Sequence, residues 1–231
     1  MSLKHPIRIV FWDIDGVIVD SEPLHEAKII ETAKAHGIEI SDTQWLNWQG
    51  IGDHRIYESL KGMGLTISKS EFLEECEDYY LDNAHLLKVR DGFTEAFNMI
   101  AERAVPQVAV SSGLKRQVDV NLEKAGVKDS MLFAVNATEI VKEGLRTKPE
   151  PDAYNYALRQ FNESLREGDQ ILPENSLVIE DSEIGVQSGV GAKMMSIHWR
   201  LSQDHPRSRL TRYHAYDAVT LTQKVEMVLA A

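Results

Sequence analysis

The apolar stretch at residues 7–12, with the two acidic residues that follow it, constrains the fold of this chain more than any other feature. The stretch is typical of a buried strand. Asp13 and Asp15 come next, and Gly16 then provides a backbone that turns freely. Ligands of an open parallel sheet bind beyond the carboxyl ends of its strands. Because alternate side chains of a strand share a face, one carboxylate could attack a substrate while the other handles a proton.

Residues 13–16 also have the composition of an ordinary surface turn. A short acidic motif occurs often without any chemistry attached to it. The choice between a turn and a reactive site therefore depends on the rest of the chain.

The composition indicates a globular protein and excludes several classes of partner. The 231 residues suffice for one large domain or for a core with a modest insert, and 43% are hydrophobic. No apolar run approaches the ~20 residues of a membrane span. The net charge of −11 argues against nucleic acid. The single cysteine, Cys76, excludes an internal disulfide; we interpret it as a passive thiol and expect a cytoplasmic protein.

Residues 20–89 have a helical texture and no convincing strand. Ser68 and Glu71 form a capping-box pattern at the start of the last helix. The apolar spacing predicts four helices, at residues 22–36, 43–48, 53–62 and 68–87. This part of the chain is therefore predicted to be a small helical insert.

Beyond Gly92, strands alternate with helices, which predicts a doubly wound parallel sheet. The predicted strands are at 107–111, 131–135, 177–180 and 193–197. The predicted helices are at 114–125, 152–161, 184–190 and 219–229. The chain thus reads as an α/β core, residues 1–19 and 90–231, interrupted by the helical insert, residues 20–89.

Two serines and a lysine are candidates for binding an anion. Ser111 and Ser112 stand between a strand and a helix, where hydroxyls and free N–H groups bind anions, although a plain N-cap serine has the same pattern. Lys148 lies between Thr147 and Pro149, and the nearby prolines are expected to hold the backbone extended and fix its direction. The alternative for Lys148 is an ordinary surface lysine.

A second acidic pair, Glu180 and Asp181, ends an otherwise apolar strand. Together with Asp13 it would offer an oxygen cage to a hard cation, and Mg²⁺ suits carboxylates, waters and a substrate phosphate. Asp181 or Ser182 could instead cap the next helix, a role that is compatible with metal binding.

The order Asp-x-Asp, Ser, Lys and acidic pair, each at a strand end, resembles the haloacid dehalogenase superfamily of phosphotransferases across nearly the whole chain. The helical insert is similar to the helical cap of that family. Residues 20–25 resemble the opening of the subgroup that contains β-phosphoglucomutase and small sugar-phosphate phosphatases. The resemblance implies a Rossmann-like core with a cap inserted after the first strand.

The resemblance also implies roles for five residues. Asp13 would attack the phosphoryl group and form an aspartyl-phosphate, and Asp15 would protonate the leaving alcohol and then activate water. Ser111, the backbone of Ser112, and Lys148 would hold the phosphoryl oxygens. These roles agree with the chemistry, because cationic groups offset the repulsion between a carboxylate and a phosphate dianion.

The metal site implied by the resemblance is a Mg²⁺ site at the same strand ends. Mg²⁺ would bind the Asp13 carboxylate, the Asp15 carbonyl oxygen and Asp181, with Glu180 in support. The presence of Asp15 as a second aspartate favours phosphate chemistry over carbon–halogen cleavage.

The insert departs from the mutase pattern at one loop. Asp53 stands where β-phosphoglucomutase has a phosphate-binding arginine, and Arg55 comes two positions later. We interpret the acidic residue as unfavourable to a second phosphate, which favours hydrolysis over mutase activity. Gly50, Asp53, His54 and Arg55 are candidates for substrate contact, or else part of a solvated loop. His25 matches a histidine of the subgroup, whose plainer role is to orient the hinge.

We therefore expect an Mg²⁺-dependent phosphatase that acts on a small phosphorylated metabolite, such as a sugar phosphate. β-Phosphoglucomutase-type transfer is the enzymatic alternative. A receiver-like or non-catalytic phosphate-binding module is the alternative from another class, but in a receiver the acidic pair comes first and no cap interrupts the chain. We expect no nucleic-acid or membrane partner, and a monomer with a dimer as the alternative.

Overall fold

The computed structural model describes residues 6–48 and 53–230 and divides the chain into two compact units. Met1–Asp20 and Lys88–Ala231 form the larger unit, and Ser21–Leu87 forms the smaller one. Each unit has its own hydrophobic core. The smaller unit is thus an insertion into the larger one.

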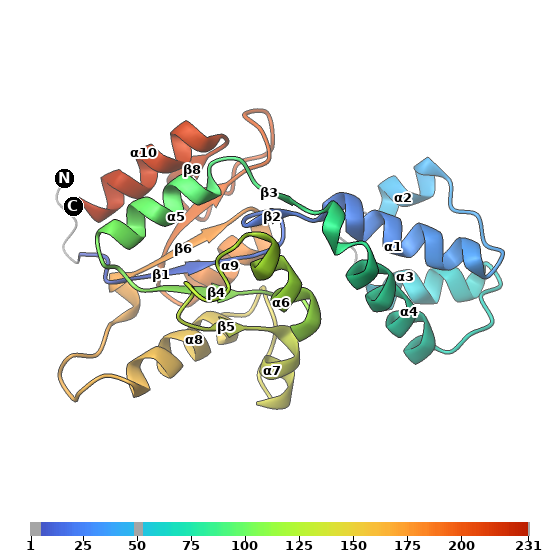
Figure 1. The fold of residues 1–231 in the computed structure, drawn as a ribbon, viewed down its shortest axis with the longest axis horizontal. Coiled ribbons are helices and arrows are strands. Elements are labelled where there is room, and N and C mark those ends of the chain that lie inside the picture. The colour runs from blue at the N-terminus through green and yellow to red at the C-terminus, as the bar shows by residue number, and fades with distance from the viewer. Residues whose placement is uncertain (1–5, 49–52, 231) are drawn as a thin grey trace. The chain divides into compact units, whose positions relative to one another are not determined.

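A six-stranded parallel sheet is the centre of the larger unit, in the order β5-β4-β1-β6-β7-β8 (Figure 1). Every neighbouring pair of strands is parallel. The strands are β1 (Ile9–Trp12), β4 (Gln107–Val110), β5 (Ala134–Val135), β6 (Ser176–Glu180), β7 (Met195–Trp199) and β8 (Tyr213–Ala215). The predicted doubly wound α/β class is confirmed.

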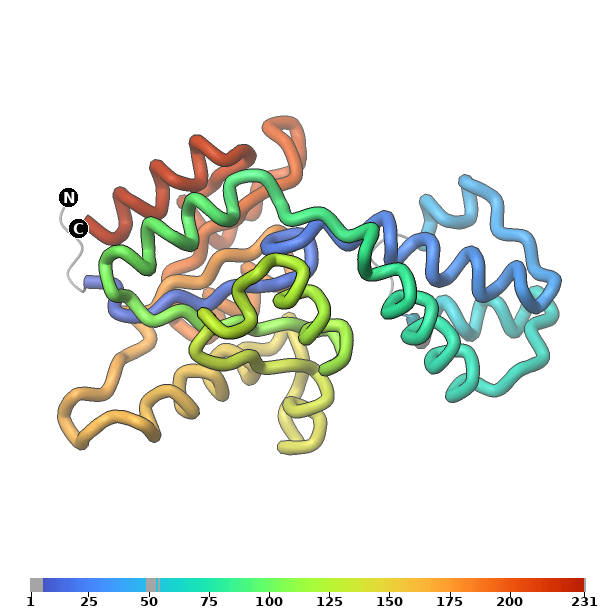
Figure 2. Tube along the Cα trace, in the orientation of Figure 1, coloured from blue at the N-terminus to red at the C-terminus, as the bar shows by residue number. Residues whose placement is uncertain are grey.

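Helices cover both faces of this sheet (Figures 1 and 2). On one face, α5 (Phe93–Glu102) packs beside α10 (Ala218–Leu229), and on the other, α8 (Asp152–Glu163) packs beside α9 (Glu183–Gly191). Two further helices, α6 (Lys115–Lys124) and α7 (Ala137–Lys142), follow β4 and β5.

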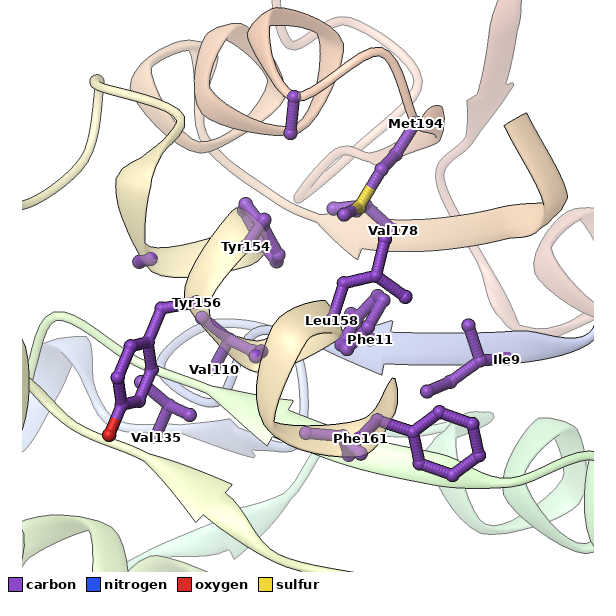
Figure 3. Close-up of a cluster of buried hydrophobic side chains, with 14 of the residues drawn as sticks. Ile9, Phe11, Val110, Val135, Tyr154, Tyr156, Leu158, Phe161, Val178 and Met194 are labelled. Atoms are coloured by element: carbon purple, nitrogen blue, oxygen red, sulfur yellow. The ribbon is translucent and has the colours of Figure 1, made fainter. Parts of the chain in front are cut away.

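Strand β1 explains why both faces are apolar. Its four residues are buried, and successive side chains point to opposite faces. The Phe11 ring meets Tyr154 of α8 at 6.2 Å, whereas the Trp12 ring meets Phe93 of α5 at 5.2 Å. Figure 3 shows the hydrophobic core on the face of the sheet that contains Phe11 and Tyr154, where β1, β4 and β6 pack against α8. A strand buried on both sides has no polar face, so it reads as a continuous apolar run.

In the described residues of the smaller unit there are four α-helices: α1 (Glu22–Ala35), α2 (Asp42–Trp48), α3 (Asp53–Gly62) and α4 (Lys69–Asp82). A short 3₁₀ turn, η1 (Ala84–Leu86), follows them, so the last predicted helix ends earlier than residue 87. Phe72 and Cys76 of α4 face the core of this unit. Burial raises the pKa of the Cys76 thiol to about 12, which keeps it protonated at neutral pH.

A two-stranded antiparallel ribbon lies where the larger unit is interrupted. It pairs β2 (Val19–Asp20) with β3 (Lys88–Val89). No sequence pattern predicts these strands, because two residues are too few to show an alternation of polar and apolar side chains.

Several elements of the larger unit differ from the predictions. The sequence pattern assigns neither helix α5, helix α7 nor strand β8, and β5 covers only Ala134–Val135 of the strand predicted at 131–135. Strand β7 begins at Met195, two residues after the predicted start, because Lys193 and Met194 still close the carboxyl end of α9 through bonds to Val190 and Gly189. A 3₁₀ turn, η2 (Pro173–Asn175), leads into β6. Among the described helices, none has the length and apolar character needed to cross a membrane.

The capping box at the start of α4 gives a test of the smaller unit's stability. The Ser68 hydroxyl accepts from the Glu71 N–H at 3.3 Å, and the Glu71 carboxylate accepts from the Ser68 N–H at 2.9 Å. Ser68→Ala should therefore lower the free energy of unfolding by about 1 kcal/mol in denaturant titration. Ser70→Ala, on the exposed side of the same turn, is the control; equal effects of both substitutions would contradict the assignment.

Candidate active site

Three adjacent strands bring the predicted site residues to one edge of the sheet. Asp13 follows β1, Ser111 follows β4, and Glu180 ends β6. Because β1 lies between β4 and β6 and all three are parallel, their carboxyl ends meet. Backbone bonds continue each ladder past the strand, with the Asp13 N–H donating to Ile179 and the Ser111 N–H to Val135, both at 3.0 Å.

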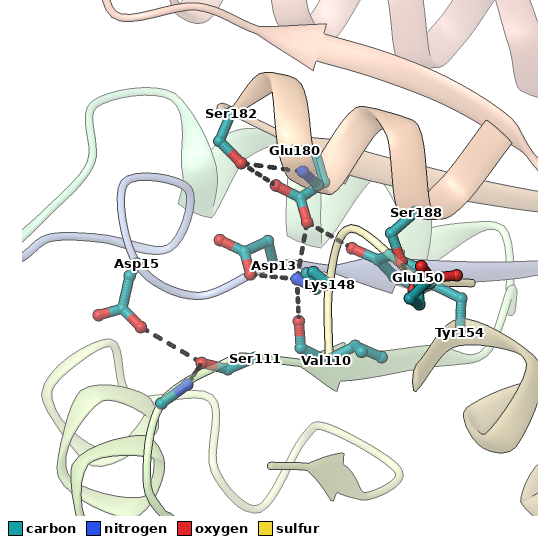
Figure 4. Close-up of polar contacts among 12 residues, drawn as sticks. Asp13, Asp15, Val110, Ser111, Lys148, Glu150, Tyr154, Glu180, Ser182 and Ser188 are labelled. Carbon is teal, nitrogen blue, oxygen red and sulfur yellow. Dashed lines mark hydrogen bonds and ion pairs between the residues drawn. The ribbon is translucent and has the colours of Figure 1, made fainter. Parts of the chain in front are cut away.

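The Lys148 ammonium joins these strand ends (Figure 4). Its Nζ donates to Asp13 Oδ1 at 2.6 Å, to Glu180 Oε1 at 2.6 Å and to the Val110 carbonyl at 2.8 Å. The side chain is only 4% exposed, so Lys148 is not a surface lysine. Its loop is a turn and not the extended segment expected: Glu150 N–H bonds to Thr147 O, and the Lys148–Pro149 peptide bond is cis.

Three carboxylates gather beside this ammonium. Asp13, Glu180 and Asp181 each offer one oxygen, and these oxygens lie within 4.8 Å of one another. Glu180 also accepts from the Tyr154 hydroxyl at 2.7 Å and from Ser182 Oγ at 3.4 Å. The cluster is mostly buried, which makes its mutual repulsion strong.

Burial and repulsion move the acidic groups away from their ordinary titration range. Burial, then the charge of Glu180, raises the pKa of Asp13 well above its usual value despite Lys148. Burial and Glu180 likewise raise the pKa of Asp181 to about 7. Burial lowers the pKa of Lys148, but Asp13 and Glu180 raise it more, so its net shift is upward. One ammonium therefore leaves the cluster with excess negative charge.

Oxygen donors and excess negative charge together suit a hard divalent cation. Asp13 and Asp181 are the predicted ligands, and the third oxygen of the group comes from Glu180. The donor set thus fits Mg²⁺, and these side chains would hold it.

Two glycines allow the carboxylates to approach the backbone. A Cβ atom on Gly16, whose φ is +74°, would lie 2.1 Å from Asp181 Oδ2. A Cβ atom on Gly185, in the first turn of α9, would lie 2.0 Å from Glu180 Oε2. No larger residue fits either position without moving an acidic side chain.

Asp15 lies on the other side of the site, facing β4. Its Oδ2 accepts from Ser111 Oγ at 3.2 Å, and its Oδ1 accepts from Asn121 Nδ2 at 3.2 Å. The Ser111 hydroxyl in turn accepts from the Gly113 N–H at 2.8 Å, while Ser112 is exposed beside it. Asp13 and Asp15 therefore differ in these contacts: Asp13 meets an ammonium and two carboxylates, whereas Asp15 accepts hydrogen bonds from the neutral side chains of Ser111 and Asn121.

Sequence reasoning missed three residues of this neighbourhood: Tyr154, Asn121 and Arg90. Tyr154 lies on α8 and Asn121 on α6, and the helical periodicity of the sequence predicts only that both side chains face the interior. Burial, then the charge of Glu180, raises the pKa of Tyr154 well above its usual value, so it stays a hydrogen-bond donor. No signal in the sequence marks Arg90, which follows β3.

Arg90 ties the turn after β1 to the end of β7. Its Nη1 donates to the Gly16 carbonyl and, at 3.0 Å, to the Trp199 carbonyl, and its Nη2 donates to the Arg200 carbonyl at 2.6 Å. The guanidinium stacks 3.8 Å from the centre of the Trp199 ring. Burial lowers the pKa of Arg90 to about 10, so it stays cationic at neutral pH.

The smaller unit holds the remaining predicted contacts. Asp53 opens α3 and forms an ion pair of 2.7 Å with Lys28, whose side chain is 4% exposed. The His25 ring lies 5.0 Å from the Tyr80 ring, and Arg55 is exposed. Gly50 and the side chain of His54 lie outside the described residues. Because Lys28 neutralises Asp53, the charge of Asp53 alone is a weaker argument against a second phosphate than the sequence suggested.

Comparisons with known proteins extend this picture. The sequence pattern of the haloacid dehalogenase-like hydrolases matches residues 7–193. The chain is 23% identical over 204 residues to the phosphorylated carbohydrates phosphatase of Thermotoga maritima, covering 83% of this chain and 84% of that protein. It is 26% identical over 200 residues to protein SUPPRESSOR OF QUENCHING 1 of Arabidopsis thaliana, which is 83% of this chain but only 18% of that protein.

A solved structure shows the same fold. Crystalline CbbY of Rhodobacter sphaeroides, in complex with phosphate, superposes with a TM-score of 0.77 at 16% identity, over 94% of this chain and 96% of that one. This likeness supports the assigned architecture of a parallel sheet with a helical insertion.

The contacts of Arg90 predict a local effect of its removal. Arg90→Met should speed amide hydrogen exchange about tenfold in the turn 16–19, because the Gly16 carbonyl loses its donor. Arg159→Met is the matched control, since Arg159 also stacks on an aromatic ring, that of Tyr156, but is 55% exposed. An unchanged rate of amide exchange at residues 16–19 would contradict the role of the Arg90 hydrogen bonds in holding this turn.

The raised pKa of Asp181 predicts how Mg²⁺ changes stability with pH. An acid whose pKa is higher in the folded state stabilises that state at low pH, so without metal this contribution is lost as pH rises from about 4 to about 7. Mg²⁺ needs the ionised form, so the rise in melting temperature on adding Mg²⁺ should be small at about pH 5.5 and large at about pH 8. Differential scanning calorimetry measures it, and Asp181→Asn should remove most of the difference.

Proposed function

We propose that this chain, which belongs to the haloacid dehalogenase-like hydrolase family, hydrolyses the phosphoric monoester of a small sugar-like metabolite with Mg²⁺ at its acidic cluster. The observation that carries the proposal is the pairing of Asp13 with Lys148 beside Glu180 and Asp181, with Asp15 held apart from them. The two aspartates thus have the separate surroundings that separate roles require.

In the first displacement, an Asp13 carboxylate oxygen attacks the phosphorus atom. The bond between phosphorus and the ester oxygen breaks, and Asp15, in its protonated form, gives its proton to the leaving alcohol. The product on the enzyme is an aspartyl-phosphate at Asp13. Ser111 and Asn121, which both donate to Asp15, are neutral, and neutral donors suit a group that changes its protonation state during the reaction.

In the second displacement, water attacks the phosphorus of this acyl phosphate. Asp15, now ionised, takes a proton from that water, the bond between phosphorus and the Asp13 oxygen breaks, and inorganic phosphate leaves. Asp13 and the protonated Asp15 are regenerated. The two-step route replaces one difficult displacement by two easier ones.

Cationic and hydrogen-bond-donating groups of the site would offset the electrostatic repulsion between the Asp13 carboxylate and a phosphate dianion. Lys148 and the Ser111 hydroxyl, with the backbone N–H of Ser112, would bind phosphoryl oxygens. When bound, Mg²⁺ would supply further positive charge to the phosphoryl group.

The substrate class is inferred from the relatives. A phosphorylated carbohydrates phosphatase matches most of the chain at 23% identity. We infer that the smaller unit acts as the cap of the family and that Asp53, paired with Lys28, offers a neutral ion pair to sugar hydroxyls. His25, Gly50, His54 and Arg55 remain candidate substrate contacts.

A pair of variants tests the two roles with p-nitrophenyl phosphate, whose leaving group needs little protonation. Asp15→Asn should release about one equivalent of p-nitrophenol per enzyme and then slow by about 10² to 10⁴-fold, because the aspartyl-phosphate forms but water is not activated. Asp13→Asn should release none. Rapid-quench kinetics measures the burst.

Glu183→Gln serves as the control, since Glu183 is exposed in the first turn of α9, near the cluster but outside it. Full turnover by Asp13→Asn would refute the proposed nucleophile. Conversion of β-glucose 1-phosphate to glucose 6-phosphate without release of phosphate would instead identify a mutase.

A further inference from the structure

Positive charge is concentrated in one segment of this acidic chain. Residues 184–216 contain five lysines and arginines and a single acidic residue, Asp204, while the chain as a whole carries a net charge of −11. The segment runs from α9 through β7 and the following loop to β8. A strong local field of this sign attracts anions.

Three of these cations line one groove of about 610 Å³. Lys193, Arg209 and Arg212 lie around a floor that includes Met194, Leu210 and Tyr213, and we call this site the basic groove. Its one acidic lining residue is Glu174, so the lining has a net charge of about +2. The volume lies in the range of sites for small organic ligands, ~300–1,000 Å³.

The basic groove is distinct from the candidate active site. Its strand residues, Met195 and Tyr213, begin β7 and β8, whereas Asp13 and Glu180 lie at the carboxyl ends of β1 and β6. Because all six strands are parallel, the basic groove lies at the opposite edge of the sheet. A ligand there would not contact the acidic cluster.

Within residues 6–48 and 53–230, none of the three groove cations forms an ion pair. Elsewhere on the same unit, exposed cations such as Lys115, Lys128 and Arg146 each have a carboxylate within 4 Å. Arg212 donates only to the Tyr213 hydroxyl, at 2.8 Å, and lies over its ring. The groove cations therefore keep their capacity for an external anion.

The backbone of Lys193 supplies an independent observation. Its φ is +62°, in the left-handed region where glycine is preferred and a larger side chain costs stability. Its N–H bonds to Val190 O at 2.9 Å, which closes α9. A lysine in this position makes the fold less stable than a glycine would, and it places an ammonium on the basic groove. Backbone strain of this kind often accompanies a functional contact.

We propose that the basic groove binds an amphipathic organic anion, in which a phosphate, sulfonate or carboxylate group is joined to an apolar body. The anionic group contacts Lys193, Arg209 and Arg212, and the apolar body lies on Met194, Leu210 and Tyr213. The apolar floor distinguishes this ligand from a bare inorganic ion.

Titration of the intact 231-residue chain with the fluorescent probe 1-anilinonaphthalene-8-sulfonate tests the proposal. The double variant Arg209→Glu/Arg212→Glu should weaken binding by about tenfold or more, because two charge-assisted contacts become repulsive. The control Lys61→Glu/Lys142→Glu changes the net charge equally at two exposed lysines that do not line the groove, and it should change the affinity by less than about twofold. Inorganic phosphate should compete only weakly.

A second comparison exploits the strained lysine. Lys193→Gly should raise the melting temperature while weakening probe binding, because glycine relieves the left-handed backbone and removes the ammonium. Ala104, with φ +53°, is the matched position: Ala104→Gly should raise the melting temperature and leave probe binding unchanged.

The readout is binding, so it is independent of hydrolysis. Binding should persist in Asp13→Asn, which would lose turnover under the proposed function. Equal affinity of the wild type and the Arg209/Arg212 double variant, or an equal loss in the Lys61/Lys142 control, would overturn the proposal.

Discussion

The ammonium of Lys148 is the interaction on which the larger unit's site depends. It is nearly excluded from water and bonds at once to β1 through Asp13, to β4 through the Val110 carbonyl and to β6 through Glu180. Removing one partner of a buried ion pair leaves an uncompensated charge, which is far more costly than removing both. Lys148 therefore fixes the relative positions of three strand ends, and it holds the Asp13 carboxylate in one direction.

Excess negative charge is the second property that organises this site. Asp13, Glu180 and Asp181 outnumber the lysine, and the raised pKa values of Asp13 and Asp181 express the cost of ionising them together. Gly16 and Gly185 allow this crowding, because a side chain at either position would displace a carboxylate. A cation bound here would relieve this repulsion between the carboxylates, and the relief would strengthen cation binding. Because only the folded chain brings the carboxylates together, cation binding would also stabilise the fold.

Much of this arrangement was predictable from local pattern. The buried strands are mostly apolar runs, and Asp13, Asp15, Ser111 and Glu180 stand at their ends, because a parallel sheet buried on both faces places most polar residues where strands stop. The turn at Lys148, helix α5 and the short strands β2, β3 and β8 were not predicted correctly. Their conformations depend on partners far along the chain: β3 pairs with β2 nearly seventy positions away, and Lys148 reaches back to Asp13.

By itself, the sequence determined the α/β class, the helical insertion and the order of the polar groups at the strand ends, since periodicity and the residue types at strand ends are local properties. Only the tertiary structure decided which charges meet. It paired Lys28 with Asp53, joined Arg90 to the Gly16 carbonyl and gathered Lys193, Arg209 and Arg212 around one groove. The strength of an electrostatic interaction depends on the distance between the charges and on their burial, and neither quantity follows from the separation of residues along the sequence.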